Sequence, residues 1–157
     1  MYSIVWRVIA IPRVYLDNCC FNRPYDDQRQ LRIELETKAK LYIQQLIVSG
    51  TLELAISYIS EMENSDNPFS VRRATIQGFF AYAAINVAET GEIIKMANEF
   101  KHAGLKTKDA LHLASAIETR SDYFLTTDDR VLKHCDKRIS ILNPVDFMFR
   151  WEAIQDE

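Results

Sequence analysis

The sequence is poor in the residues that mark disulfide-rich, disordered or heavily looped proteins. Its three cysteines are the adjacent pair Cys19 and Cys20 and the distant Cys135, which fit neither a disulfide framework nor a spaced zinc site. Four glycines and four prolines in 157 residues indicate short connections and little disorder. These scarcities predict an ordinary globular protein in the reducing cytoplasm.

The sequence also lacks a strong excess of either charge and a long hydrophobic run. A net charge of −3 does not suggest wholesale nucleic-acid binding, although it would hide an acidic pocket with a basic rim. Residues 1–12 are apolar, but they are too short to span a membrane and contain Arg7. We expect them to form an N-terminal extension, as an extra strand, an arm or an over-called start, ahead of a single domain over 13–157.

Short apolar runs alternate with longer amphipathic segments along the chain. The run at 13–17 has no polar alternation and stops on Asp17, which fits a strand buried on both faces at the centre of a parallel sheet. Further strands are expected at residues 52–56, 85–87, 123–126 and 139–142. Helices are expected at about 31–48, after Ser57, at 70–84, after the cap Thr90, at 106–119, after Asp129 and at 144–154. This alternation predicts an α/β fold with a mostly parallel sheet.

The first long helix is expected to pack one apolar stripe against the sheet. The stripe follows spacings of three and four, with Leu31, Leu35, Ala39, Tyr42, Ile43, Leu46 and Ile47. The basic residues would then face away from the sheet, namely Arg29, Arg32, Lys38 and Lys40.

Four carboxylates stand at strand ends or on the helices that follow them. Asp17 ends the first strand, Glu63 lies on the helix after the second, Asp109 opens a helix, and Asp128 follows the fourth strand. All four can reach one rim of the sheet, where ligands bind in α/β folds. Two carboxylates about 4 Å apart repel by roughly 4 kcal/mol at an effective dielectric constant near 20, so the group needs protonation or a cation. Bound Mg²⁺ or Mn²⁺ could activate water for phosphodiester hydrolysis.

Four segments between Arg13 and Phe149 resemble the successive motifs of PIN-domain nucleases. They are Tyr15-Leu16-Asp17-Asn18, Glu63 before Asn67-Pro68, Lys108-Asp109-Ala110-Leu111-His112-Leu113-Ala114-Ser115-Ala116, and Tyr123-Phe124-Leu125-Thr126-Thr127-Asp128-Asp129. The resemblance implies a three-layer α/β/α sandwich and a metal-dependent endoribonuclease that cuts single-stranded RNA. It also implies a VapC-type toxin of a VapBC toxin–antitoxin pair. The first motif departs from the family pattern at Asn18-Cys19-Cys20.

The resemblance also implies the site residues. The catalytic and metal-binding carboxylates would be Asp17, Glu63, Asp109 and Asp128, with Mg²⁺ or Mn²⁺ as the cofactor. Glu61 is the alternative to Glu63, and Asp129 is the alternative to Asp128. The motif match favours Glu63 and Asp128. His112 is expected to be packed rather than catalytic.

Residues around the carboxylates are expected to bind substrate. Thr126 would hold a carboxylate or a water, and the basic side chains of Arg23, Lys106 and Lys108 would contact phosphate. Cys19 and Cys20 lack a basic partner and are expected to be small buried residues near the site rather than nucleophiles.

The expected partners are a single-stranded or structured RNA, a small antitoxin protein and a second copy of the chain in a homodimer, with no membrane. One alternative is a non-catalytic PIN-like module that binds RNA or protein, which the four acidic positions disfavour. Another is an aspartate-based phosphohydrolase, whose Asp-x-Asp pattern is broken here by Cys19.

Overall fold

The chain is built around a five-stranded sheet, which the computed structural model shows within the described residues, 10–156. All four strand pairings are parallel, and the spatial order is β3-β2-β1-β4-β5. The strands are β1 (Arg13–Leu16), β2 (Glu53–Ser57), β3 (Ala83–Val87), β4 (Tyr123–Leu125) and β5 (Ser140–Leu142). The first strand of the chain is therefore the central one, as its continuous apolar character predicts.

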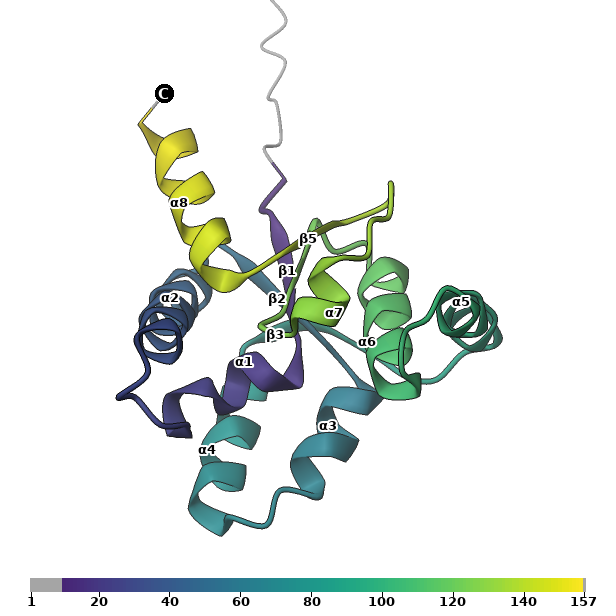
Figure 1. Cartoon of the computed structure of the whole chain (residues 1–157), viewed down its shortest axis with the longest axis horizontal. Helices are drawn as coiled ribbons and strands as arrows, with labels where there is room; N and C mark the ends of the chain where they lie inside the picture. The colour runs from purple at the N-terminus through teal and green to yellow at the C-terminus, as the bar shows by residue number, and fades with distance from the viewer. Residues whose placement is uncertain (1–9, 157) are drawn as a thin grey trace, which may run out of the picture.

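Helices cover both faces of this sheet (Figure 1). They are α1 (Asn18–Asn22), the 3₁₀-helix η1 (Arg23–Tyr25), α2 (Leu31–Val48), α3 (Tyr58–Ser65), α4 (Ser70–Phe80), α5 (Gly91–His102), α6 (Thr107–Glu118), α7 (Asp129–Leu132) and α8 (Pro144–Gln155). The helices α2 and α8 lie on one side, and α5 and α6 lie on the other. The predicted three-layer α/β/α sandwich is confirmed. Within the described residues, no helix is long and apolar enough to cross a membrane.

The central strand divides the core into two parts because successive side chains of a strand point to opposite faces. Val14 and Leu16 pack with Ile43 of α2 and other apolar groups on one face. Tyr15 points to the other face and packs with Leu113 of α6. This alternation fixes the strand between two helical layers and holds its carboxyl end at the rim of the sheet.

Most boundaries follow the predicted signals. The Ser57 side chain accepts a hydrogen bond from the backbone N–H of Ile59 and forms a capping box with Ser60, and Thr90 caps α5. The helix predicted at 70–84 ends at Phe80, because the chain enters β3 at Ala83. The predicted third strand was therefore two residues too short.

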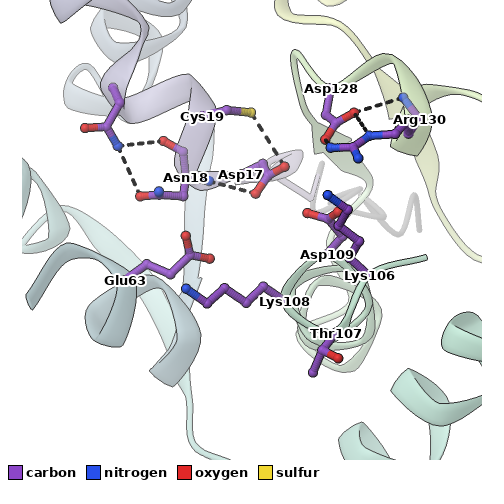
Figure 2. Close-up of a pocket in the computed structure, with 11 residues that line it drawn as sticks. Asp17, Asn18, Cys19, Glu63, Lys106, Thr107, Lys108, Asp109, Asp128 and Arg130 are labelled. Atoms are coloured by element: carbon purple, nitrogen blue, oxygen red, sulfur yellow. Dashed lines mark hydrogen bonds and ion pairs between the residues drawn. The ribbon is translucent and has the colours of Figure 1, made fainter. Parts of the chain in front are cut away.

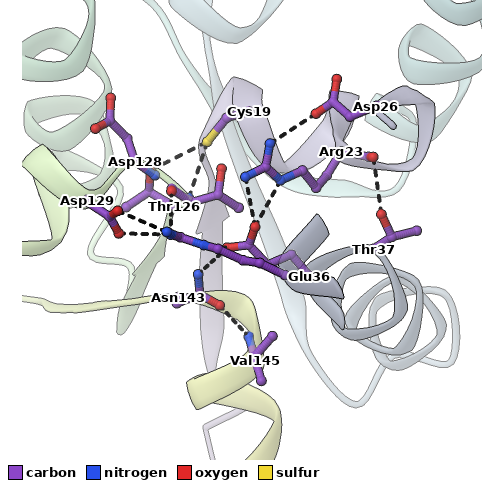
Figure 3. A network of polar contacts seen from close by, with 12 residues as sticks. Cys19, Arg23, Asp26, Glu36, Thr37, Thr126, Asp128, Asp129, Asn143 and Val145 are labelled. Atoms are coloured by element: carbon purple, nitrogen blue, oxygen red, sulfur yellow. Dashed lines mark hydrogen bonds and ion pairs between the residues drawn. The ribbon is translucent and has the colours of Figure 1, made fainter. Parts of the chain in front are cut away.

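The predicted buried stripe of α2 is wrong at its N-terminal end. Leu31 is 68% exposed and Leu35 is 44% exposed, whereas Glu36 is only 1% exposed. The Glu36 carboxylate is buried because it accepts hydrogen bonds from Arg23 at 2.8 and 2.9 Å and from the amide of Asn143 (Figure 3). Contacts from η1 and from the residue before α8 thus turn a polar face of α2 inward.

Lys40 was predicted to face away from the sheet, but it is buried, with 7% of its surface exposed. Its Nζ lies 5.8 Å from the ring centre of Phe21 and 5.5 Å from that of Phe79. It donates a hydrogen bond of 2.8 Å to the side chain of Gln44. Burial lowers the pKa of Lys40 to about 8, because the charged ammonium loses its hydration.

We expect Lys40→Met to raise the free energy of unfolding at pH 7 by about 2 kcal/mol, because it removes a poorly solvated charge. An unfolded lysine keeps its proton up to a pH of roughly 10.4, so between pH 8 and that value the unfolded wild type binds more protons than the folded form. Wild-type stability therefore rises across this window, and the advantage of the variant should shrink. Urea unfolding at pH 7, 8.5 and 10 measures this difference, with the exposed Lys38→Met as control. An advantage that stays constant with pH would contradict the assignment.

The predicted N-terminal extension falls on residues 1–12, of which 1–9 lie outside the described residues. Residues 10–12 lead directly into β1, and the carbonyl oxygen of Pro12 accepts a hydrogen bond from the backbone N–H of Glu53. The division into an extension and a single domain over 13–157 stays a prediction.

Candidate active site

The four predicted carboxylates lie around one cavity at the carboxyl edge of the sheet (Figure 2). Asp17 follows β1 and caps α1, and Asp128 follows the neighbouring strand β4 and caps α7. Glu63 comes from α3 and Asp109 from the first turn of α6. The cavity has a volume of about 500 Å³. Its lining comprises Asp17, Asn18, Cys19, Asn22, Glu63, Lys106, Thr107, Lys108, Asp109, Asp128 and Arg130.

Asp17 is the most buried of the four. It is 5% exposed, and its Oδ1 accepts a hydrogen bond of 2.8 Å from the backbone N–H of Asn18. Its Oδ2 accepts a hydrogen bond of 2.8 Å from the hydroxyl group of Thr126. Thr126 is fully buried behind the cavity, so it contacts a carboxylate as expected but does not line the cavity itself.

The adjacent cysteines occupy different environments. Cys19 lines the cavity, with its Sγ 3.6 Å from Oδ2 of Asp17 and 3.5 Å from Oγ1 of Thr126. Cys20 is fully buried in the core on the α2 side of the sheet. Within the described residues neither thiol has a hydrogen bond to a basic side chain, and the expectation that they are not nucleophiles stays a prediction.

Glu63 is held from behind by His112, which the sequence predicted to be packed. His112 is 1% exposed, and its Nε2 lies 2.5 Å from Oε1 of Glu63 and 3.8 Å from Oδ1 of Asp17. Burial lowers the pKa of His112. The pKa is raised by Tyr15, by the hydrogen bond to Glu63 and by the negative charges of Asp17 and Glu63. These effects outweigh burial, so the pKa of His112 lies well above its usual value. His112 is therefore packed, as predicted, and is also bonded to a candidate site residue.

Asp109 carries the clearest sign of uncompensated negative charge. Burial raises its pKa, and the negative charges of Asp17 and Asp128 raise it further. The nearby His112 and Arg130 oppose this effect only partly. Such a carboxylate is destabilising when ionised alone and would be stabilised by a cation in the cavity.

Asp128 is paired with a cation of its own chain. Its carboxylate accepts hydrogen bonds from the backbone N–H of Arg130 at 2.9 Å and from the Arg130 guanidinium at 3.1 and 3.3 Å. These hydrogen bonds lower the pKa of Asp128 and keep it ionised. Arg130 was not among the residues predicted for the site. The signal was available, because an Asp that caps a helix commonly meets the residues two and three positions later.

The two alternative carboxylates lie elsewhere. Glu61 is exposed and does not line the cavity. Asp129 forms an ion pair with Arg32 of α2, with distances of 2.8 and 2.9 Å, and also stays outside the cavity. The choice of Glu63 and Asp128 therefore agrees with the geometry, and the role of each residue stays a prediction.

Basic side chains line the cavity together with the carboxylates. Lys106 and Lys108 both line it, and Lys108 extends across it toward Glu63 (Figure 2). Arg23, by contrast, lies outside the cavity, with its guanidinium bound to Glu36 and Asp26 (Figure 3). The two lysines thus lie at the cavity and Arg23 does not, and the phosphate contacts stay a prediction.

The residues around the cavity fit a hard divalent cation that keeps several water ligands. In the part of the chain that the structure describes, no three His, Cys, Asp or Glu side chains lie close enough together to hold a metal ion by themselves. The carboxylates surround a space instead of converging on a point, and their donors are oxygen atoms. Magnesium and manganese suit this arrangement, because Mg²⁺ is usually bound by one or two carboxylates, substrate phosphates and water.

Comparisons with known proteins agree with this geometry. The model of the PIN domain family matches residues 14–137. The crystal structure of VapBC2 from Rickettsia felis, bound to a DNA fragment from their promoter, contains a chain with the same fold. The TM-score is 0.54 at 13% sequence identity, over 83% of this chain and 98% of that one. A comparison with curated proteins gives no significant match. Because the family model covers most of the chain, this protein belongs to the PIN domain family.

Proposed function

We propose that this PIN domain is a metal-dependent endoribonuclease that cleaves single-stranded RNA. The observation that carries the proposal is the meeting of Asp17, Glu63, Asp109 and Asp128 around one cavity that also contains basic side chains. PIN domains are generally nucleases, which supports the reaction class. Burial, and after it the negative charges of Asp17 and Asp128, raise the pKa of Asp109, which supports the use of a cation.

The four carboxylates would hold Mg²⁺ or Mn²⁺. When bound, the cation supplies a water of lowered pKa and a positive charge for the phosphate oxygens. Thr126 and the backbone of Asn18 orient the carboxylate of Asp17, which otherwise could rotate. Lys106 and Lys108 would bind the phosphates that flank the scissile bond.

The same proposal includes the biological setting. The structural neighbour is described as a VapBC2 complex on promoter DNA, which supports a role as the toxin of a toxin–antitoxin pair. A small antitoxin would bind this chain, and the protein would act on RNA in the cytoplasm as a homodimer. These partners follow from family resemblance and from the neighbour's description.

Incubation of purified protein with a panel of tRNA, rRNA and mRNA fragments tests the proposal. We expect cleavage with Mg²⁺ or Mn²⁺ and no cleavage in EDTA, with poor activity in Ca²⁺ because its looser coordination misplaces the attacking water. Cleavage that persists in EDTA would contradict the metal mechanism. Metal binding with no cleavage of any RNA would favour the non-catalytic alternative.

A further inference from the structure

A line of buried polar side chains runs from the centre of the sheet to the cavity. It begins at Tyr15 of β1, passes through His112 of α6 and ends at Glu63 of α3. The hydroxyl group of Tyr15 lies 2.7 Å from Nδ1 of His112, and both side chains are almost completely buried. Because three separate elements contribute, this line depends on the tertiary structure rather than on local sequence.

The direction of the bond to Glu63 is fixed by the chemistry of its acceptor. An ionised carboxylate can only accept hydrogen bonds, so Nε2 of His112 donates whether the ring is neutral or charged. That bond occupies Oε1 of Glu63. Within residues 10–156 the other oxygen, Oε2, has no hydrogen bond, and Glu63 lines the cavity. One oxygen is thus anchored, and the other is left for a ligand.

The imidazole itself is held in place. The hydroxyl group of Tyr15 lies 2.6 Å from Oγ of Ser57 and 3.2 Å from Oγ of Ser60. These two serines form the capping box of α3, the helix that carries Glu63. The ring of Tyr15 stacks on Phe124 with centroids 5.6 Å apart. The hydroxyl group of Tyr15 therefore contacts both the first turn of α3 and His112, the residue that is bonded to Glu63.

We propose that His112 is a positioning residue, supported by Tyr15, which fixes the carboxylate of Glu63 for binding of a divalent cation in the cavity. The inference rests on the proposed metal-dependent function and adds a residue that touches neither substrate nor cation. Partners of this kind around a metal site fix the orientation of a ligand, and their loss commonly weakens metal affinity by about 10- to 100-fold. The same order is expected here.

Calorimetric titration of the full chain with Mn²⁺ in the absence of RNA tests this role. We expect His112→Leu to weaken Mn²⁺ binding by about 10- to 100-fold. His112→Gln should recover part of the affinity, because its terminal amide can donate from nearly the position of Nε2. Ser115→Ala is the matched control, since this buried hydroxyl of the same helix has no hydrogen-bond partner within the described residues. It should bind Mn²⁺ as wild type does.

Tyr15→Phe provides a second test of the role of His112 if His112→Leu fails to fold. It keeps the ring and its stacking on Phe124, removes the support of the imidazole, and should weaken Mn²⁺ binding by a smaller factor, roughly 3- to 10-fold. Circular dichroism confirms that each variant is folded. Equal affinity in wild type and a folded His112→Leu variant would overturn the role of His112 and leave the proposed nuclease intact. If His112→Leu does not fold, equal affinity in wild type and Tyr15→Phe would do the same. A wild type that binds no Mn²⁺ at millimolar concentration would overturn both.

Discussion

Asp17→Asn is expected to reduce metal-dependent RNA cleavage by at least about 1000-fold, which corresponds to roughly 4 kcal/mol of transition-state stabilisation. The substitution preserves the shape of the side chain and removes its negative charge. Its Oδ1 can still accept the hydrogen bond from the backbone N–H of Asn18, so the cap of α1 and the fold should remain. Initial cleavage rates at saturating Mn²⁺, together with circular dichroism, measure the two effects separately.

Adjacent carboxylates provide matched controls for this loss. Asp128 lines the cavity, whereas Asp129 points to Arg32, so Asp128→Asn should lower activity far more than Asp129→Asn. Glu63→Gln should likewise lower it more than Glu61→Gln. The reverse ranking in either pair would move the proposed site by one or two residues. Near-normal cleavage by Asp17→Asn would remove the basis of the proposed mechanism.

The effect of Asp109→Asn on stability, measured against wild type, is expected to change sign when Mn²⁺ is added. Without metal the variant should melt no lower than wild type, because it relieves repulsion of about 1 kcal/mol or less from Asp17 and Asp128. The raised pKa of Asp109 means that ionising this carboxylate costs more free energy in the folded protein than in the unfolded chain. With Mn²⁺ at a hundredfold excess over Kd, wild type should gain about 2.7 kcal/mol, whereas the variant gains little.

Paired melting curves in EDTA and in millimolar Mn²⁺ measure this reversal. Asp129→Asn is the control, because this carboxylate is exposed and paired with Arg32 outside the cavity. It should show the same Mn²⁺-induced shift as wild type. If Asp109→Asn also keeps the full shift, Asp109 takes no part in metal binding.

Local patterns predicted an α/β fold with a mostly parallel sheet and the rim where the carboxylates would meet, whereas the three layers were implied by the resemblance to PIN-domain nucleases. The apolar run of β1 ends on Asp17, and the carboxyl ends of β1 and β4 lie side by side because these strands pair in parallel. Ser57 and Thr90 cap their helices as the sequence indicated. The spacing of apolar residues and the capping of helices depend on residues that are close in sequence, so the sequence alone can predict them.

Tertiary contacts account for what local patterns missed. The buried face of α2 is set by the pairing of Glu36 with Arg23 and by the rings around Lys40, and no periodicity within the helix signals either. The position of His112 three residues after Asp109 predicted that it is packed, but it showed nothing of the contact with Tyr15, which lies 97 positions earlier in the chain. Buried polar side chains of this kind are found only when their distant partners are known.

The central claim is that Asp17, Glu63, Asp109 and Asp128 together bind a catalytic divalent cation. Anomalous diffraction from crystals of the wild-type protein soaked in Mn²⁺ tests it most directly. We expect a manganese peak inside the cavity, with ligand distances near 2.1 Å to oxygen atoms of these carboxylates. A peak at another place, or an empty cavity in crystals whose protein still cleaves RNA with Mn²⁺, would contradict it.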